Sequence, residues 1–308
     1  MPRYVTRGRK TRQARYKKRA PTRKYRRPTR PSYRRKSGGM SRKRILNVTS
    51  TKKQDNMLSF SNTDNTGGSK TVAAGGLYVN GAYSYGMSVW CATARSMVTA
   101  GVTDQYIDAA DRCSATCYMR GLKENLRIQT NSPMPWLWRR IVFTTKGNTF
   151  LNAAPADTPT QTYRAYSDTS IGIARQWFNL QANSMPSTVN GFNGIIFKGT
   201  FNQDWNDVIT AKVDTSRITV KSDRTCTIRT GNSNGHFSDR KLWYPMNANL
   251  VYDDDESGAG TTTQYFSTDA KAGMGDMFVI DYLVPGLGAA STDIINLNST
   301  ATLYWHEK

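Results

Sequence analysis

The 308-residue sequence predicts an all-β protein, an antiparallel β-sandwich or jelly roll with long loops, preceded by a disordered basic N-terminal arm. Three observations support this class. Roughly eight to ten short runs rich in aromatic and β-branched residues alternate with turn residues. These runs are not separated by the helices of a βαβ pattern. The excess positive charge is concentrated at the N-terminus.

The charge distribution divides the chain into two parts. Residues 1–54 contain 22 of the 43 Lys and Arg residues, and the first acidic residue is Asp55. The other 21 basic residues and all 22 acidic residues lie in residues 55–308, which therefore carry a net charge of −1, against +21 for the whole chain. The body is electrostatically balanced, and the arm is strongly cationic.

The arm is too charged and too poor in aliphatic residues to bury the apolar surface that folding requires. Pro21, Pro28 and Pro31 prevent a long helix. Residues 9–20 are rich in helix-forming residues and could form a transient helix. We therefore expect residues 1–44 to be a disordered arm.

The arm has the composition of a segment that binds single-stranded nucleic acid. Arg is more frequent than Lys, and its guanidinium group matches pairs of phosphate oxygens. Tyr4, Tyr16, Tyr25 and Tyr33 lie between the charges, where their rings can stack on unpaired bases. No scaffold for reading base edges is evident, so binding should not depend on base sequence. The predicted DNA-binding residues are Arg3, Arg7, Arg9, Lys10, Arg12, Arg15, Lys17, Lys18, Arg19, Arg23, Lys24, Arg26, Arg27, Arg30, Arg34, Arg35, Lys36, Arg42, Lys43 and Arg44.

Two other roles can be considered for the same charges, nuclear import and membrane anchoring, and the sequence supports only the first. The basic clusters at residues 17–19 and 34–36 would serve a nuclear-import receptor. A membrane-surface anchor would need an aliphatic face, which the arm lacks. No stretch approaches the ~18 continuous apolar residues of a membrane span, so we expect no membrane insertion. The N-terminus also lacks the apolar region of a secretory signal.

The sequence contains no recognisable catalytic constellation. Phosphate-binding GxxxxGK[ST] and HExxH motifs are absent, and His236 and His306 are the only histidines. We expect neither enzymatic activity nor a cofactor. Four cysteines do not make a disulfide framework or a zinc site, and Cys113 and Cys117 lack CxxC spacing. We expect free thiols at Cys91, Cys113, Cys117 and Cys226.

The first half of the body alternates strand-like runs with turns. Residues 45–62 alternate polar and apolar side chains and predict an entering strand. Residues 77–94 are rich in aromatic and β-branched residues and predict one or two strands. Residues 98–111 are the best candidate for a short helix outside the arm. Residues 116–129 are amphipathic, and Gly121 favours a strand with a turn over a helix.

The remaining elements follow the same reasoning. Residues 136–145 predict a strand with a basic pair in its middle, and residues 152–170 predict a long loop. Residues 237–252 contain Pro245 and predict irregular extended chain. Further strands are predicted at residues 195–201, 207–213, 217–220, 225–229, 277–284 and 294–305.

Three groups in the body are candidate contact residues. Trp136 and Trp138 share a strand face and suit core packing first and base stacking second. The acidic run Asp253, Asp254, Asp255 and Glu256 predicts an exposed loop and a subunit interface. Clustered carboxylates can bind Ca²⁺, but the run lacks the alternating spacing of a calcium loop, so no metal is expected. A second basic set, either a nucleic-acid contact or ordinary surface charge, comprises Arg120, Lys123, Arg127, Arg139 and Arg140.

Four stretches carry a family resemblance. They are SRKRILNVTSTKKQDNMLSFSN, KSDRTCTIRTGNSNGHFSDRKLWYPMNANLVYDDDESG, GMGDMFVIDYLVPG and the terminus STATLYWHEK. The sequence resembles the capsid proteins of genomoviruses, the gemycircularvirus-like group of viruses with small circular single-stranded DNA. The most specific markers are LVYDDDESG and TLYWHEK.

The resemblance implies a single viral jelly roll over residues 45–308 and a small icosahedral shell with the arm facing inward. It implies no enzymatic activity. The implied partners are a circular single-stranded DNA genome, other copies of the chain and a host nuclear-import receptor, in the virion and in the host nucleus. In a shell of about sixty copies, 22 charges per chain would neutralise on the order of 1,300 phosphates.

Two other functions agree less well with the charge and the composition of the chain. A non-assembling nucleic-acid-binding protein with a basic tail usually also carries excess charge on its folded body, whereas residues 55–308 are balanced. An enzyme with a localisation tag would need acid–base groups that the chain largely lacks.

Overall fold

The computed structural model describes residues 39–99, 102–103 and 105–308. The chain divides into two units, Met1–Ile45 and Leu46–Lys308, and all the described sheets belong to the second. The described helices are α1 (Arg42–Thr49) and α2 (Pro186–Ile196). The described strands are β1 (Thr51–Met57), β2 (Ser59–Thr63), β3 (Ser69–Ala74), β4 (Leu77–Asn80), β5 (Gly86–Cys91), β6 (Val98–Thr99), β7 (Val102–Thr103), β8 (Thr116–Thr130), β9 (Trp136–Thr145), β10 (Ser167–Thr169), β11 (Gly172–Trp177), β12 (Thr219–Ile228), β13 (Phe237–Val251), β14 (Asp255–Ser257), β15 (Gly260–Thr262), β16 (Asp276–Pro285) and β17 (Ile294–Glu307).

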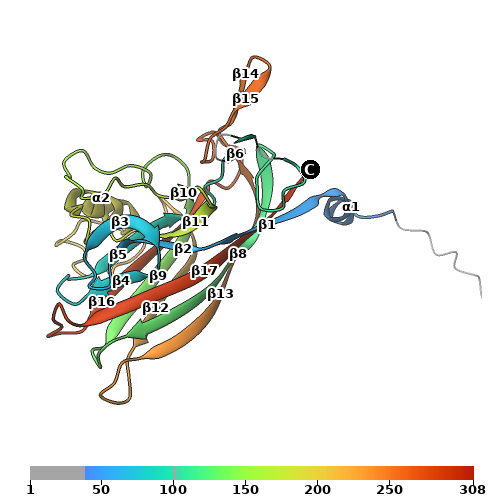
Figure 1. The fold of residues 1–308 in the computed structure, drawn as a ribbon. Helices are drawn as coiled ribbons and strands as arrows, with labels where there is room; N and C mark the ends of the chain where they lie inside the picture. Colours follow the sequence, from blue (N-terminus) through green and yellow to red (C-terminus); the bar gives the residue numbers. More distant parts are fainter. Residues whose placement is uncertain (1–38, 100–101, 104) are drawn as a thin grey trace, which may run out of the picture. The chain divides into compact units, whose positions relative to one another are not determined.

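Two antiparallel sheets form the centre of the second unit (Figure 1). The first has the strand order β1-β17-β8-β13, with β4 also paired to β17. The second has the order β12-β9-β16-β5. A smaller sheet, β10-β11-β2-β3, contains a parallel pair between β11 and β2. The expectation of an all-β, mainly antiparallel protein is confirmed.

The two main sheets pack face to face. Leu303 of β17 and Leu122 of β8 belong to the same buried cluster as Val142 of β9 and Val279 of β16. The opposite face of the second sheet is also buried, because α2 and the chain between β9 and β12 cover it, as Phe192 illustrates. The second sheet therefore consists of nearly continuously buried strands, whereas the first alternates buried and exposed residues. This asymmetry leaves one broad sheet face in solvent.

Several predicted strands are confirmed. Residues 77–94 form two strands, β4 and β5, and the predictions at 136–145, 277–284 and 294–305 match β9, β16 and β17. Residues 116–129 are a strand, but one that continues through Gly121 rather than turning there. The long loop at 152–170 is present up to β10. The four cysteines form no disulfide with one another, as expected.

One prediction in the first half was right only in part, and another was wrong. The strand predicted over residues 45–62 is present from Thr51 as β1 and β2, but residues 45–49 belong to α1, which Ser41 caps by accepting a hydrogen bond from the Arg44 backbone N–H at 3.4 Å. The helix predicted over 98–111 is absent from the described residues there, which form the β6–β7 pair followed by turns. Val and Thr at the paired positions favour extended backbone.

Three predictions in the second half were also wrong. The strands predicted at 195–201 and 207–213 are replaced by the end of α2 and by irregular chain. By contrast, the strands predicted at 217–220 and 225–229 are confirmed over 219–220 and 225–228, although they are parts of one continuous strand, β12. The segment 237–252 is not irregular but forms β13, which accommodates Pro245 in a bulge.

Candidate nucleic-acid interface

Most of the predicted DNA-binding residues, from Arg3 to Lys36, lie outside the described residues. Arg42, Lys43 and Arg44 form the first turn of α1, where the side chains of Arg42 and Arg44 are exposed. The site that the structure does describe is the exposed face of the β1-β17-β8-β13 sheet, here called the outer sheet face.

The alternation of β-strands assembles the outer sheet face. On β8, the exposed positions include Arg120, Lys123 and Arg127. Its neighbour β13 exposes every second residue, with Asp239 opposite Arg127 and Lys241 opposite Asn125. Lys52 extends the same face on β1. Five cations and one carboxylate thus lie on this face, and all of them except Lys52 belong to residues 55–308, whose net charge is −1: Lys52, Arg120, Lys123, Arg127 and Lys241, with Asp239.

The cations of this face are available to a ligand. Among the described residues, no ion pair involves Lys123, Arg127 or Lys241. Arg120 donates a hydrogen bond to the side-chain oxygen of Asn247 on β13. A phosphate backbone that crosses these strands would meet cations whose charge no acidic residue of the described chain offsets through an ion pair.

Aromatic rings occupy the middle of the outer sheet face. Trp243 of β13 is 49% exposed, and its ring centroid lies 5.9 Å from that of Tyr304 on β17. Gly121 of β8 is paired with Tyr304 on one side and with Pro245 on the other. A Cβ atom at Gly121 would lie 2.6 Å from the Trp243 ring, so the glycine lets the indole lie close over the strand. Exposed aromatic rings among cations are the arrangement on which single-stranded bases stack.

His306 lies at one end of this face, where nearby positive charges contribute to lowering its pKa. It lies opposite Lys52 on β1 and Tyr118 on β8, and its ring centroid is 5.9 Å from that of Tyr118. Partial burial lowers the pKa of His306 below its ordinary value of 6.5, and the charges of Lys52 and Arg120 lower it further. The imidazole is therefore mainly neutral at pH 7.

The prediction that Arg139 and Arg140 could join this basic set was wrong. Both side chains are buried, 5% and 3% exposed, on strand β9 of the other sheet. Arg139 forms an ion pair of 2.7 Å with Asp223 of β12, and Arg140 pairs with Glu124 and Asp281. Trp136 and Trp138 are also buried, so they pack in the core and are not a surface for bases.

Arg140 belongs to a buried ionic network that joins the two main sheets. Its Nε donates to Asp281 of β16 at 2.7 Å, and it also binds Glu124 of β8. Arg175 of β11 donates to Glu124 Oε1 at 2.9 Å, and its guanidinium lies 3.4 Å from the centroid of the Trp177 ring. Burial raises the pKa of Glu124, but the two guanidinium groups outweigh it and hold that pKa at about 2.

The acidic run 253–256 is divided between two roles. Asp254 is bound inside the chain by Arg112, with their closest N–O approach 2.5 Å and both side chains at most 2% exposed. The residues Asp253, Asp255 and Glu256 are exposed, and the last two begin the β14–β15 hairpin. No group of three or more potential metal ligands occurs among the described residues. The negative charge of Asp254, which lies next to Asp253 and Asp255 in the sequence, is therefore offset by Arg112 of the same chain.

Sequence reasoning missed four residues of the outer sheet face: Lys52, Lys241, Trp243 and Tyr304. A signal for two of them was present, because residues 237–243 alternate in a way that places Lys241 and Trp243 on one face of a strand. Pro245 obscured it, because a proline is unexpected within a central strand.

The sequence was also compared with known proteins. No protein-family model matches it, and no curated protein matches it. Neither described helix has the length and apolar character needed to cross a bilayer.

Proposed function

We propose that this chain is the capsid protein of a genomovirus-like virus, which assembles into a small icosahedral shell and packages circular single-stranded DNA. The observation that carries the proposal is the outer sheet face, a cationic and aromatic surface on a body whose net charge is −1. The strongly basic arm leads through α1 into β1, an outermost strand of the same sheet. Strand β1 therefore connects the two proposed DNA-binding elements of the chain, the arm and the outer sheet face.

The strand pairing supports the finer assignment of a viral jelly roll. Without the short strand β4, the two main sheets contain eight strands, which in chain order are β1, β5, β8, β9, β12, β13, β16 and β17. The first pairs with the last, the second with the seventh, the third with the sixth and the fourth with the fifth. This nested antiparallel pairing is what results when one long hairpin is rolled into two four-stranded sheets, the arrangement of capsid jelly rolls.

The number of basic residues that can contact packaged DNA differs from the count in residues 1–54. Lys53 was counted in the arm, but its side chain is buried and paired with Glu307, with 3.4 Å between Nζ and Oε2. The 20 basic residues of the arm remain, and the five cations of the outer sheet face add to them. In a shell of about sixty copies, the arms alone would neutralise on the order of 1,200 phosphates. Release of counterions would drive packaging without base readout.

The remaining expectations form part of the same proposal. The basic clusters of the arm would bind a host nuclear-import receptor, which places the protein in the host nucleus as well as in the virion. The exposed members of the acidic run would contact a neighbouring copy. We propose no enzymatic role and no cofactor for the chain.

The assembly part of the proposal is tested by sedimentation of the purified full chain with and without a circular single-stranded DNA. Megadalton particles are expected. A chain that binds DNA but sediments only as a monomer or small oligomer would instead identify the non-assembling nucleic-acid-binding protein.

The DNA-binding part is tested with an oligothymidine and three variants. We expect deletion of residues 1–40 to abolish most binding and to leave the β-sheet circular dichroism unchanged. We expect Lys123→Ala/Arg127→Ala/Lys241→Ala to reduce the salt dependence, log Kobs against log[salt], by about one for each phosphate that the variant no longer binds. The matched control, Lys198→Ala/Lys212→Ala/Lys271→Ala, removes three exposed cations outside the face. Equal reductions in the two triple variants would overturn the assignment of the outer sheet face.

A further inference from the structure

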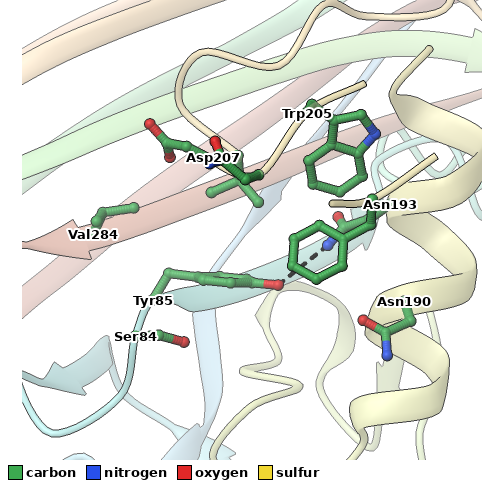
Figure 2. A pocket seen from close by; sticks show the side chains of 10 residues that line it. Ser84, Tyr85, Asn190, Asn193, Trp205, Asp207 and Val284 are labelled. Carbon is green, nitrogen blue, oxygen red and sulfur yellow. Dashed lines mark hydrogen bonds between the residues drawn. The ribbon is translucent and has the colours of Figure 1, made fainter. Parts of the chain in front are cut away.

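A second candidate site lies away from the outer sheet face, on the side of the second sheet that α2 covers. It is a pocket of about 260 Å³ between the residues preceding β5, helix α2, the chain around residues 201–208 and Val284 of β16. Figure 2 shows Tyr85 from the first of these segments directed toward Asn193 of α2, with Trp205 and Asp207 from the third. None of these residues takes part in the proposed DNA interface.

The pocket combines flat apolar surfaces with neutral polar groups. Its aromatic residues are Tyr85, Phe201 and Trp205. The side chains of Ser84, Asn190 and Asn206 also line it, and the structure gives them no hydrogen-bond partner among the described residues. The charged residue among the described lining residues is Asp207, which accepts a hydrogen bond from the Ile209 backbone N–H through Oδ1. No Lys or Arg of the described chain lines the pocket.

The aromatic part of the pocket is held in place by packing and hydrogen bonds. The Trp205 ring packs against those of Phe197 and Phe201, with centroid distances of 4.9 and 5.0 Å. Buried Asn193 donates to the Tyr85 hydroxyl at 3.2 Å and accepts from the Tyr282 hydroxyl at 2.7 Å. A ligand would therefore meet surfaces that are already ordered, which lowers the entropy cost of binding.

We propose that this pocket binds a neutral saccharide unit. The C–H face of a pyranose packs on an aromatic ring, and its hydroxyl groups are both donors and acceptors, as are the amide and hydroxyl groups that line the pocket. The volume suits one ring and is below that of most drug-sized sites. A lining whose described residues include the carboxylate of Asp207 and no cation disfavours phosphates, nucleotides and acidic sugars.

The main chemical competitor is a cation. Aromatic rings with a nearby carboxylate also bind alkylammonium groups. The three neutral polar side chains without partners in the described chain favour a ligand rich in hydroxyls over a methylated ammonium, which donates and accepts no hydrogen bonds. The site is independent of the DNA-binding proposal and would survive its failure.

The test is saturation-transfer NMR on the full chain with the methyl glycosides of glucose, galactose, mannose and N-acetylglucosamine. Tetramethylammonium and thymidine monophosphate serve as the competing probes. At least one glycoside is expected to bind with millimolar affinity. We expect Phe201→Ala to weaken that binding about tenfold, because the ring is 52% exposed and its removal leaves the core intact. Asn190→Ala, on the exposed side of α2, is a second variant that should fold normally.

The matched control is Phe237→Ala, which removes the ring of another exposed phenylalanine, 64% exposed, from β13 outside the pocket. Binding that falls in both pocket variants and is retained in the control supports the proposal. No saturation transfer from any of the four glycosides at about 20 mM would overturn it. Glycoside binding that is unchanged in both pocket variants, or transfer seen only with tetramethylammonium or thymidine monophosphate, would overturn it equally.

Discussion

Replacing Glu124 with Gln tests the buried ionic network directly. The substitution keeps the shape of the side chain and removes its charge, so that Arg140 and Arg175 keep Asp281 as the one carboxylate they still share in the network. All four side chains are at most 3% exposed, so water cannot take the place of the lost carboxylate. We therefore expect a large loss of folding free energy.

The size of the loss follows from the pKa of Glu124. The network lowers this pKa from 4.5 to about 2. At about 1.4 kcal/mol per pKa unit, this corresponds to about 3 kcal/mol of stability at pH 7. Breaking a buried ion pair in other proteins costs roughly 3–5 kcal/mol, which agrees. A change of that size should lower the melting temperature by roughly 6–12 °C for a domain of this length.

The pH dependence supplies the more specific readout. Because the folded-state pKa of Glu124 is depressed, its contribution is fully present above about pH 4.5 and is lost as the pH falls toward 2. Unfolding by urea, followed by tryptophan fluorescence at pH 7 and at about pH 3, should show a gap between wild type and Glu124→Gln that narrows in acid. Glu256→Gln, an exposed glutamate on the β14–β15 hairpin, is the matched control. A difference below about 1 kcal/mol at pH 7, or one independent of pH, would refute the reasoning.

Three further predictions concern other groups. Bound phosphates on the outer sheet face should raise the pKa of His306, so oligothymidine should bind more tightly as the pH falls, by up to about tenfold per pKa unit, and this gain should be absent in His306→Gln. Burial raises the pKa of Asp276 to about 6, so folding favours its protonated form. Lowering the pH from 7 to 5 should therefore add about 1 kcal/mol to the free energy of unfolding from this group. Thermal melts of Asp276→Asn should lack that gain. Asp254→Asn should lower the melting temperature because it breaks a buried ion pair, whereas Asp253→Asn/Asp255→Asn should reduce particle yield in sedimentation without changing the melt. Unchanged yield in the double variant would limit that run to an exposed loop.

The strands that were predicted correctly are those whose burial is visible in the sequence, either as a continuous apolar run or as a regular alternation of polar and apolar residues. β9 and β16 are continuous apolar runs because both faces of their sheet are covered, and β17 alternates because one face is exposed. α2 was missed although Val189, Phe192 and Ile196 have helical spacing and Pro186 marks a helix start. Its apolar residues are Val, Phe and Ile, which also favour strands, and the strand predicted at 195–201 covered its last two residues.

The outer sheet face could be predicted only in part, because the register between strands that are distant in sequence brings its residues together. Arg120, Lys123 and Arg127 were recognised on one strand, but their aromatic neighbours come from β13 and β17. Arg139 and Arg140 were wrongly included in the basic set, because both are buried in the other sheet. Adjacent charges inside an apolar strand point to both faces of a buried sheet, so each needs an acid inside the protein. Asp281, within the apolar run MFVIDYLV, was the visible candidate.

The position of these buried arginines changes what the net charge of the body means. Arg95, Arg112, Arg139, Arg140 and Arg175 all form ion pairs with acidic residues in the interior or partly buried beside it. Internal pairs cancel in the total, and they contribute little field at the surface. Because each pair removes one basic and one acidic residue, the rest of the body still sums to −1, and the cations of the outer sheet face are offset by exposed acidic residues elsewhere, such as Asp253, Asp255 and Glu256. It follows that the balanced body, taken alone, does not separate a capsid protein from a non-assembling nucleic-acid-binding protein. That distinction rests on whether the exposed carboxylates of the β14–β15 hairpin and its base contact a second copy, because only an assembling chain needs such a contact.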